Sequence, residues 1–305
     1  MSGRISLSAA VMTYNEEANL ERCLESVCVR AAEVVIVDSF STDRTLEIAR
    51  RYTDRIHQHH YEGHPQQWQW TLDHVPFQHD WIFAVDADFQ VTPALWELIA
   101  EALERGDPAV NGYFVRHRQV FRGRFLRHGT LYPRYWLRLF RHRAVRVDLD
   151  ELVDVHFYVQ PPVGRLEHDV IEDNVKDRDL AFWIGKQLRF AEQQAVEELR
   201  GRGSADAASA APPRLLGSPD QRILRLKQMW RRLPRYLRPF LLFGYRYVIR
   251  LGFLDGKEGL LYHFTQALLY RLAVDVRMEE LEAGAADAER ADAPSAPSPQ
   301  AAERS

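Results

Sequence analysis

Residues 5–38 read ISLSAAVMTYNEEANLERCLESVCVRAAEVVIVD. They begin with a short apolar run, Ile5–Met12, and end with a run rich in β-branched residues, Glu33–Val37, so each run predicts a buried strand. Between the two runs, Asn15 followed by two glutamates is typical of a helix start, and this helix is expected to reach about Val29. A strand, a helix and a strand of these lengths predict a βαβ unit with parallel strands.

The same alternation continues along the chain. A short strand is expected at Arg55–His60, a helix at Gln66–His74, and a fourth apolar strand at Trp81–Val85, WIFAV. Thr92 and Pro93 then begin another helix, because threonine caps helices and proline is favoured in the first turn. After residue 111 the pattern changes, and mixed or antiparallel strands are expected at Gly112–Gln119, Trp136–Arg141 and Val155–Gln160. We therefore predict an α/β fold with a mainly parallel, mixed sheet flanked by helices.

The composition is that of a globular protein: of 305 residues, 46% are hydrophobic and 27% are charged, and the net charge is −3. One large domain is expected over residues 1–200, followed by a flexible connection rich in Gly, Ala, Ser and Pro at 201–220. A basic, amphipathic helical extension is expected at 221–282. A disordered tail rich in Ala, Pro, Ser and acidic residues is expected at 283–305.

Three observations bear on the compartment. Cys23 and Cys28 lie on one predicted helix, so a disulfide between them is not expected and a reducing compartment fits. Met1–Ala10 has no apolar core of signal-peptide length, so secretion is not expected. No apolar run near the C-terminus approaches the ~20 residues that span a bilayer, so no transmembrane segment is expected there.

The first, second and fourth predicted strands each end in a cluster of polar side chains. The clusters are Thr13, Tyr14, Asn15 and Glu16; then Asp38, Ser39, Ser41 and Asp43; and finally Asp86 and Asp88 on either side of Ala87. In an open parallel sheet, ligands bind at the carboxyl ends of the strands. The sequence therefore predicts a ligand site built from these three loops.

The residue types in these clusters suit particular ligands. Asp86 and Asp88 suit a hard divalent cation such as Mg²⁺ or Mn²⁺, which prefers oxygen ligands and bridges to diphosphate oxygens. The alternative is a turn whose aspartates bond their own backbone, although the position after WIFAV favours the metal interpretation. Asp38 can bind a uracil or a ribose, or can be an ordinary turn residue. Tyr14 can stack on a base, or can be a half-buried loop aromatic.

Three segments resemble, in order and spacing, the nucleotide-sugar domain of family 2 glycosyltransferases: VMTYNEEANLERCLESV, VVIVDSFSTDRTLEIA and WIFAVDADFQVTPAL. Within that family the chain is similar to the lipopolysaccharide-core and exopolysaccharide glucosyltransferase-like enzymes. The resemblance covers about residues 5–280, through RLFR at 138–141, GRLEHD at 164–169, GKQLRFAEQQA at 185–195 and GFLDGKEGLLYHF at 252–264. It implies a GT-A fold, which is Rossmann-like, and inverting transfer from a nucleotide diphosphate sugar, with UDP-sugars favoured.

The resemblance also implies roles for the residues at matching positions. The nucleoside would be held by Thr13, Tyr14, Glu16 and Asp38, and Asp86 would also contact the nucleotide sugar. Asp86 and Asp88 would hold Mg²⁺ or Mn²⁺ together with the diphosphate. Such a cation would neutralise the charge that develops on the departing diphosphate.

Inverting transfer needs a general base that takes a proton from the acceptor hydroxyl. We predict Asp154 for this role, with Glu151 as the next candidate, and an ordinary loop acid is the alternative for each. Arg138, Arg141 and His156 are expected to contact phosphate or the acceptor. For His156, a structural hydrogen-bonding role is the alternative.

The chain departs from the family pattern at three positions. Phe89 replaces the acidic residue that follows the aspartate pair, Gln69 replaces an asparagine, and His156 is followed by Phe157 instead of a glutamate. These departures leave the base and the sugar specificity open. They do not remove the carboxylates expected to bind the nucleotide and the metal.

The C-terminal part is basic and rich in aromatic residues, because Arg214–Gly252 holds ten basic residues and one acidic residue. This composition is typical of helices that lie in an anionic membrane interface, with a surface predicted to include Trp230, Arg235, Arg238, Phe240 and Arg246. The alternative is a helical subdomain packed on the core with its arginines in solvent. Nucleic acid is not an expected partner, because no recognition motif is present and the whole chain is slightly acidic.

The leading hypothesis is a metal-dependent, inverting glycosyltransferase that acts on a cell-envelope glycan or a lipid-linked acceptor. It would be cytoplasmic and peripheral on the inner face of the cytoplasmic membrane. A second hypothesis is transfer to a polyprenyl phosphate, which would use the same donor site. A third is a non-catalytic membrane scaffold that binds nucleotide sugars, which Phe89 and Gln69 favour.

Overall fold

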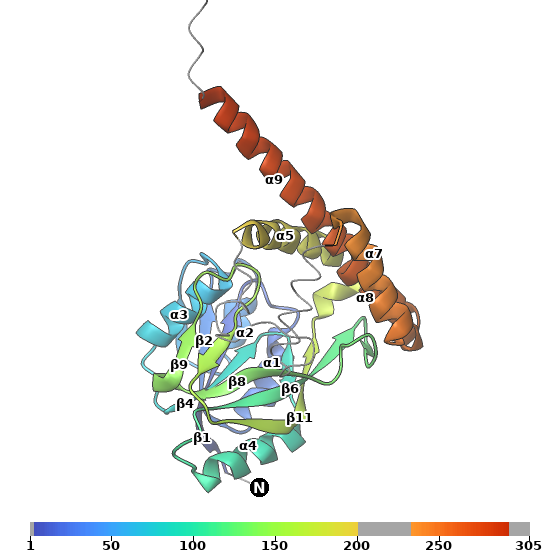
Figure 1. Cartoon of the computed structure of the whole chain (residues 1–305). Coiled ribbons are helices and arrows are strands. Elements are labelled where there is room, and N and C mark those ends of the chain that lie inside the picture. Colours follow the sequence, from blue (N-terminus) through green and yellow to red (C-terminus); the bar gives the residue numbers. More distant parts are fainter. Residues whose placement is uncertain (1–2, 201–232, 293–305) are drawn as a thin grey trace, which may run out of the picture.

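The computed structural model describes residues 3–200 and 233–292 and contains a central sheet with helices on both faces (Figure 1). The predicted connection at 201–220, Trp230, and residues 293–305 of the predicted tail lie outside the described residues. Cys23 and Cys28 are free thiols, as expected.

The described strands are β1 Ile5–Thr13, β2 Ala31–Asp38, β3 Ile56–Gln58, β4 Trp81–Asp86, β5 Phe89–Val91, β6 Gly112–Phe121, β7 Arg124–Phe125, β8 Arg134–Arg141, β9 Val145–Val147, β10 Phe157–Val159 and β11 Val163–Asp173. Within the described ranges, nine of them form one sheet in the order β3-β2-β1-β4-β8-β6-β11-β5, with β7 beside β6. Strands β3, β2, β1 and β4 are parallel, β8 is antiparallel to β4 and β6, and β11 is parallel to β6. The predicted α/β fold with a mixed, largely parallel sheet is confirmed.

Helices cover both faces of the sheet. Successive residues of a strand point to opposite faces, so one strand contributes side chains to the cores on both sides. On β4, Phe83 and Val85 pack in the core that includes α1 (Leu20–Cys28) and α4 (Pro93–Arg105). The alternate residues of β4 pack on the other face with Trp68 of helix α3 (His64–His74). The run WIFAV is apolar throughout because both faces of β4 are buried.

Helix α1 begins at Leu20 and not directly after Asn15, which corrects the predicted helix start. Asn15 has a left-handed backbone conformation, φ 52°, and so cannot lie in a right-handed helix. Its side-chain Oδ1 accepts a hydrogen bond from the backbone N–H of Thr42 at 2.8 Å. Asn15 therefore joins the loop after β1 to the loop after β2. Thr92, in contrast, caps α4 as predicted, because its hydroxyl accepts from the backbone N–H of Leu95 at 3.3 Å.

Three strands of the sheet, β5, β7 and β11, lie outside the sequence-based predictions. The sequence of β11, VGRLEHDVIED, does not alternate regularly between apolar and polar residues. The pairing of β11 with β6 explains why, since the register shifts between Leu166 and Asp169. The buried Asp169 on this strand is paired with Arg116 and Arg118 of β6. Asp169 is thus tolerated inside the sheet because β6 supplies its two arginine partners.

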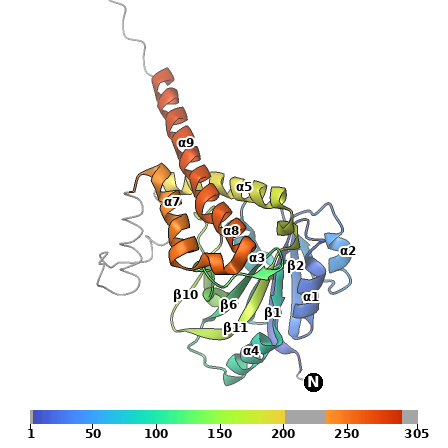
Figure 2. The same ribbon diagram turned by 90° about the vertical axis from the view of Figure 1, so that its right-hand side faces the viewer.

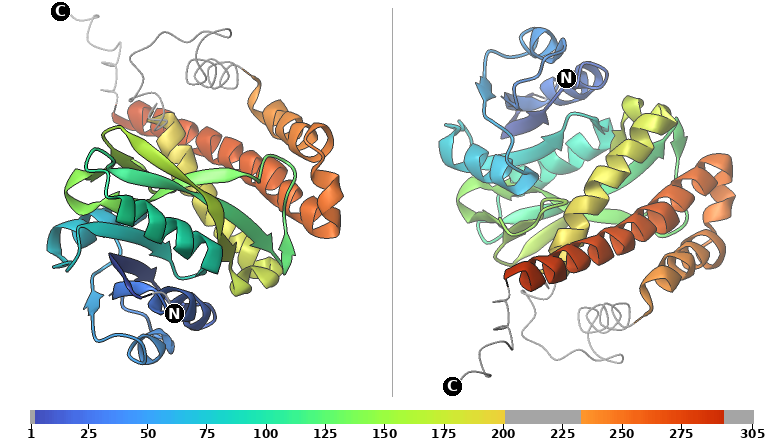
Figure 3. Two further views of the ribbon diagram at one scale, coloured as in Figure 1. Left: turned by 90° about the horizontal axis from the view of Figure 1, so that it is seen from below. Right: turned by 90° about the horizontal axis from the view of Figure 1, so that it is seen from above.

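The C-terminal helices pack against α5 (Leu180–Leu199), and Figures 2 and 3 show α5 and α9 side by side. Val274 and Met278 of α9 contact Ala191 and Ala195 of α5. The elements of this region are η3 Arg235–Leu237, α7 Arg238–Phe243, η4 Gly244–Ile249, η5 Gly252–Asp255, α8 Gly256–His263, η6 Phe264–Leu269 and α9 Tyr270–Asp292. The predicted helical extension is therefore a group of helices docked on the α/β domain.

Helix α9 continues to Asp292, and Figure 1 shows its second half projecting away from the rest of the molecule. This corrects the predicted start of a disordered tail at residue 283. Residues 283–292, AGAADAERAD, are rich in alanine, which has the highest helix propensity. Among the helices that the structure describes, none is both long and apolar enough to span a membrane.

Candidate functional site

The loops that follow β1, β2 and β4 meet at one edge of the sheet. In the strand register, Thr13 pairs with Asp38, and Met12 pairs with Asp86, so the last residues of three parallel strands are neighbours. The three polar clusters expected from the sequence are therefore brought together in the structure.

Asp38 lies at the end of β2 and is completely buried. Its carboxylate accepts hydrogen bonds from the Thr13 hydroxyl at 3.0 Å, the backbone N–H of Ser41 at 2.9 Å and the Gln58 amide at 3.1 Å. These donors offset the cost of burying a charge. Asp38 and Thr13 thus lie in contact at the predicted nucleoside end of the site, and Asp38 also anchors the loop after β2.

Tyr14 and Glu16 lie in the loop after β1, next to this anchor. The Tyr14 side chain is 58% exposed, so the face of its ring is accessible to a ligand. Glu16 is held by Lys176, whose Nζ lies 2.6 Å from Glu16 Oε1, and by the Asn19 amide at 2.7 Å. The Tyr14 ring is therefore free to stack, whereas the Glu16 carboxylate is already paired.

A polar pocket of about 380 Å³ opens beside the end of β4. Its wall contains acidic, basic and aromatic side chains from the α/β domain and from the C-terminal helices. We call it the polar pocket, and its lining is His64, Asp86, Asp88, Gln119, Arg134, Trp136, Arg138, Val153, Asp154, Glu172, Asp177, Trp183, Lys186, Gln187, Phe190, Tyr262, Gln266 and Tyr270. It brings together four residues predicted from the sequence: Asp86, Asp88, Arg138 and Asp154.

Arg138 connects β8 to the aspartate pair. It is buried, and its Nη2 lies 2.9 Å from Asp86 Oδ2. The guanidinium lies over the rings of Phe89 and Trp136, with its central carbon 5.2 and 5.4 Å from the ring centroids. Phe89, which departs from the family pattern, thus supports Arg138 through a cation–π contact.

The polar pocket contains more carboxylates than cations. Burial raises the pKa of Asp88 well above its ordinary range, and the charges of Glu172 and Asp86 raise it further. Lys186 Nζ lies 3.6 Å from Asp177 Oδ1, yet burial still raises the pKa of Asp177 to about 6. This part of the pocket therefore suits a ligand or ion that carries positive charge.

Several pocket residues were not predicted. Glu172 lies on β11, where it pairs with Phe89 of β5, and neither strand was expected from the sequence. Lys186 belongs to the segment GKQLRFAEQQA, which carries part of the family resemblance, and that resemblance was the available signal. Asp177 follows β11 and gave no signal, because its position in the pocket depends on how α5 packs.

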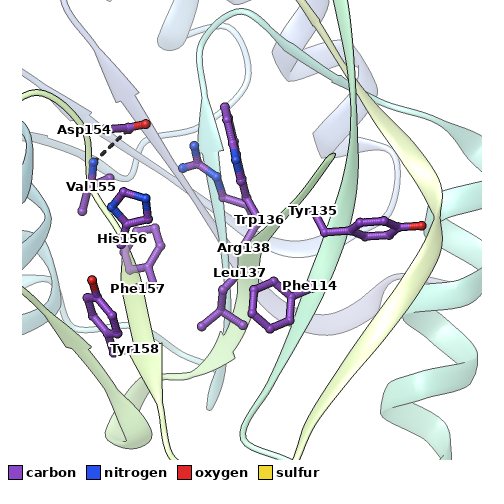
Figure 4. A pocket seen from close by; sticks show the side chains of 10 residues that line it. All are labelled: Phe114, Tyr135, Trp136, Leu137, Arg138, Asp154, Val155, His156, Phe157 and Tyr158. Carbon is purple, nitrogen blue, oxygen red and sulfur yellow. Dashed lines mark hydrogen bonds between the residues drawn. The ribbon is translucent and has the colours of Figure 1, made fainter. Parts of the chain in front are cut away.

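An aromatic pocket of about 220 Å³ adjoins the polar pocket, and the two share Trp136, Arg138 and Asp154 (Figure 4). Figure 4 shows the segment Asp154–Tyr158 on one side and β8 with Phe114 on the other. The lining of this aromatic pocket is Phe114, Tyr135, Trp136, Leu137, Arg138, Asp154, Val155, His156, Phe157 and Tyr158. Asp154 is exposed and lies at the junction of the two pockets.

Glu151 does not line either pocket. It is buried behind His156 and accepts hydrogen bonds from the backbone N–H of His156 at 2.9 Å and from the Tyr158 hydroxyl at 3.0 Å. The ring Nδ1 of His156 lies 3.1 Å from Glu151 Oε1. Burial alone would raise the pKa of Glu151, but the contact with His156 lowers it, and the same contact raises the pKa of His156. Glu151 therefore positions His156, which argues against its expected role as a base.

Arg141 and Gln69 line neither pocket. Arg141 is three residues from Arg138 on β8 and pairs with Asp80. Its expected contact with phosphate or the acceptor therefore finds no support in the two pockets. Gln69 donates from its side-chain amide to Asp73 on the same helix at 2.9 Å, so it is part of the surface of α3.

The arginines predicted to face a membrane are mostly paired within the protein. Arg238 is buried, and its Nε lies 2.8 Å from Asp275 Oδ1, which joins α7 to α9. Arg235 Nη1 lies 2.6 Å from Glu282 Oε2. Burial lowers the pKa of Arg246. The expectation that Arg238 contacts a membrane is therefore corrected, because its charge is neutralised inside the helical group.

Apolar side chains are nevertheless exposed along the consecutive helical elements η3, α7 and η4. We call this stripe the C-terminal apolar face, and it consists of Leu237, Phe240, Leu241, Tyr245, Val248 and Ile249. Leu237, Phe240 and Leu241 recur at the intervals of three and four residues that place side chains on one side of an α-helix. Tyr245, Val248 and Ile249 continue the exposed apolar residues along the π-helix η4. Phe240 was predicted at this surface, and the structure leaves it exposed.

The family model described as Glycosyl transferase family 2 matches residues 8–160 of this chain. The lipopolysaccharide core biosynthesis glycosyltransferase LpsC of Rhizobium meliloti (strain 1021) is 36% identical over 169 residues, which cover 54% of this chain and 61% of LpsC. An uncharacterized glycosyltransferase of Rickettsia bellii (strain RML369-C) is 34% identical over 93 residues, which cover 30% of this chain and 31% of that protein. The chain thus spans less than two thirds of the length of each relative.

Two solved structures are similar to this chain at low sequence identity. S. aureus TarS, residues 1–349, has a TM-score of 0.40 and 14% identity, and the match covers 92% of each chain. Glucosyl-3-phosphoglycerate synthase from Mycobacterium tuberculosis, in complex with Mn²⁺ and UDP-glucose, has a TM-score of 0.32 and 20% identity over 37% of this chain and 44% of that chain.

Proposed function

Because this chain belongs to glycosyl transferase family 2, we propose that it transfers a hexose, with inversion, from a nucleotide diphosphate sugar to a cell-envelope glycan or lipid-linked acceptor. A UDP-sugar is the favoured donor. The observation that carries the proposal is the meeting of Thr13, Asp38 and Asp86 at one sheet edge, next to a pocket that also contains Asp154. The name of the relative LpsC supports an acceptor of the lipopolysaccharide-core class.

The donor is proposed to lie along the carboxyl ends of β1, β2 and β4. The nucleoside would lie against the exposed Tyr14 ring, over the loops that the buried Thr13–Asp38 contact anchors, and the diphosphate would reach the polar pocket. Arg138 supports this placement, because its buried Nη1 has no hydrogen-bond partner among the described residues. A guanidinium with a free N–H is a strong donor to phosphate oxygens.

Asp86 and Asp88 would hold Mg²⁺ or Mn²⁺ together with the donor diphosphate. In the described ranges, no three His, Cys, Asp or Glu side chains are grouped so that they could hold a metal by themselves. Magnesium bound to a nucleotide, however, takes one or two carboxylates from the protein and its other ligands from phosphate and water. The donor set therefore fits, and when bound the cation would neutralise charge on the leaving diphosphate.

Asp154 is the proposed general base. Its carboxylate takes the proton of the acceptor hydroxyl as that oxygen forms a bond to the anomeric carbon of the donor sugar. The bond from the anomeric carbon to the diphosphate breaks, and its electron pair leaves with the nucleoside diphosphate. Arg138 and Lys186 line the same pocket and would stabilise the negative charge that moves onto the leaving group.

We propose that the enzyme acts at the cytoplasmic face of the membrane, as a peripheral protein. The support is the C-terminal apolar face, because such a stripe is costly to leave in water and inserts readily into a membrane interface. A lipid-linked acceptor would then be presented beside the helices that line the polar pocket.

The proposal is tested by thermal unfolding of the protein with UDP-, GDP- and dTDP-sugars, each with and without Mn²⁺. A ligand at 100 times its Kd stabilises a protein by about 2.7 kcal/mol, so a bound donor raises the Tm measurably. We expect one nucleotide class to do so in a metal-dependent way. Asp88→Asn should abolish the metal dependence, whereas Asp73→Asn, at an exposed aspartate of α3, should leave it unchanged.

Turnover separates an enzyme from a binding protein. With an LPS-core acceptor preparation, we expect release of UDP and labelling of the acceptor. We expect Asp154→Asn to reduce turnover by about 100-fold or more while the donor still raises the Tm. Donor binding with neither transfer nor hydrolysis would instead indicate the scaffold hypothesis. No Tm shift with any nucleotide sugar, in a folded sample, would contradict the proposal.

A further inference from the structure

We propose that the aromatic pocket binds one pyranose ring of the acceptor, against its apolar wall, with the ring hydroxyls toward Asp154 and His156. The inference rests on the proposed function, because it assigns a place to the second substrate of the same site. It is carried by the composition of the pocket, by its polar rim and by the residues it shares with the polar pocket.

The wall of the aromatic pocket matches the apolar face of a sugar. A pyranose has C–H groups on its faces and hydroxyl groups around its rim, so aromatic side chains bind the face while polar groups bind the rim. Phe114 of β6 is 37% exposed, and Trp136 and Tyr158 are also only partly buried (Figure 4). The volume of about 220 Å³ is below the range typical for drug-sized ligands and suits a single ring.

The rim of the aromatic pocket is polar and held in place. The buried carboxylate of Glu151 contacts both the backbone N–H and the ring Nδ1 of His156. This arrangement makes Nδ1 the donor toward Glu151 and leaves Nε2 for another partner. Asp154 is exposed beside it, and its Oδ1 accepts from the backbone N–H of Val155 at 2.8 Å (Figure 4). Two oriented groups are therefore available for sugar hydroxyls.

The position of the aromatic pocket points to the acceptor and not to an unrelated sugar. Trp136, Arg138 and Asp154 line both pockets, so a ring in the aromatic pocket would lie next to a donor in the polar pocket. Asp154, the proposed base, would then face a hydroxyl of that ring. Placing the two reactants in adjacent pockets also gives the proximity that transfer between them requires.

The test is saturation-transfer difference NMR on the full chain with UDP and Mg²⁺ present. The probes are methyl pyranosides of glucose, mannose and galactose. We expect ring-proton signals from at least one of them. Phe114→Ala should weaken that binding about tenfold, which corresponds to a contribution of about 1.4 kcal/mol. Phe253→Ala, at another partly exposed phenylalanine on η5, is the matched control and should leave it unchanged.

His156→Ala is a second variant, because it alters the rim and not the wall. It should also weaken pyranoside binding. In both Phe114→Ala and His156→Ala, UDP should raise the Tm by the same amount as in the unaltered protein. The assignment would be overturned by the absence of pyranoside signals, by signals that are present without UDP and disappear when UDP is added, or by signals that neither variant changes. If UDP did not raise the Tm of the unaltered protein, that result would instead contradict the proposed donor site, so the two failures are distinguishable.

Discussion

The contact between Glu151 and His156 makes part of the stability depend on pH. The contact raises the pKa of His156 above the ordinary 6.5. The stabilisation that the contact gives the folded protein is therefore complete below about pH 6.5 and is lost as the pH rises through the raised pKa. The same contact lowers the pKa of Glu151 below the ordinary 4.5, so its stabilisation of the folded protein is also lost as the pH falls through this lowered pKa. We expect Glu151→Gln to destabilise the protein most between about pH 4.5 and 6.5.

Urea unfolding at several pH values from 5 to 8.5 measures this effect. The difference in the free energy of unfolding between the unaltered protein and Glu151→Gln should become smaller as the pH rises above 6.5. It should not vanish, because Glu151 still accepts from Tyr158 and from the His156 backbone. Glu101→Gln, at an exposed glutamate of α4, is the control and should give a constant small difference. A constant difference for Glu151→Gln as well would show that the pair does not titrate as described.

Individual site residues could be predicted where a strand ending placed them. Asp38 and Asp86 each follow an apolar run, and the parallel register then brings both to one edge. Asp154 was predicted because inverting transfer needs a general base, and the structure leaves it exposed at the junction of the two pockets. The sequence alone could not show that Glu151 and Arg141, unlike Asp154, line neither pocket. Their burial and partners depend on contacts between distant segments, such as the pairing of Arg141 with Asp80.

At the scale of elements, a buried ion pair joins helix α7 to helix α9. Arg238 of α7 is bonded to Asp275 of α9, and Glu198 of α5 lies 3.4 Å from Arg238 Nη2. Removing one partner of a buried pair costs about 3–5 kcal/mol, because it leaves an uncompensated charge. We expect Asp275→Ala to lower the free energy of unfolding by about 3 kcal/mol, since Glu198 still compensates part of the charge.

Chemical denaturation and hydrogen exchange measure this prediction. Exchange should increase most in α7 and in the half of α9 that contacts α5. The double variant Arg238→Met/Asp275→Leu should regain much of the loss, because it removes both charges. Glu280→Ala, which breaks an exposed pair with Arg277 on the same helix, should cost less than about 1 kcal/mol. Equal effects of Asp275→Ala and Glu280→Ala would contradict the role assigned to the buried pair.

Elements were predictable where one signal dominated. The parallel strands have uninterrupted apolar runs, because both of their faces are buried. Helix α4 has a threonine cap and a proline in its first turn. The predicted start of α1 was wrong because asparagine is favoured both at a helix N-cap and in a left-handed turn. Asn15 adopts the turn, and its side chain bonds to Thr42 in the neighbouring loop. Strand β11 was missed because its register shift breaks the alternation that a prediction needs.

The whole molecule is more closely joined than the predicted division at residue 200 implies. Tyr262, Gln266 and Tyr270 belong to the C-terminal helices, and all three line the polar pocket. The α/β domain therefore supplies the strand ends, and the C-terminal helices complete the wall around them. The C-terminal apolar face lies on other elements of the same helical group, η3, α7 and η4. Binding to a membrane surface would thus fix the orientation of the pocket relative to that surface.

We expect the proposed membrane binding to depend more on apolar side chains than on the described arginines. Ile249 is 70% exposed on the C-terminal apolar face, and inserting such a side chain contributes about 2 kcal/mol. We expect Ile249→Asp to reduce binding to phosphatidylglycerol-containing vesicles about thirtyfold in a flotation assay. Val29→Asp, at a 64% exposed residue after α1, should leave binding unchanged. Arg235→Gln should have a small effect, because Arg235 is paired with Glu282. Equal losses for Ile249→Asp and Val29→Asp, or vesicle binding that survives Ile249→Asp, would exclude this face as the membrane contact.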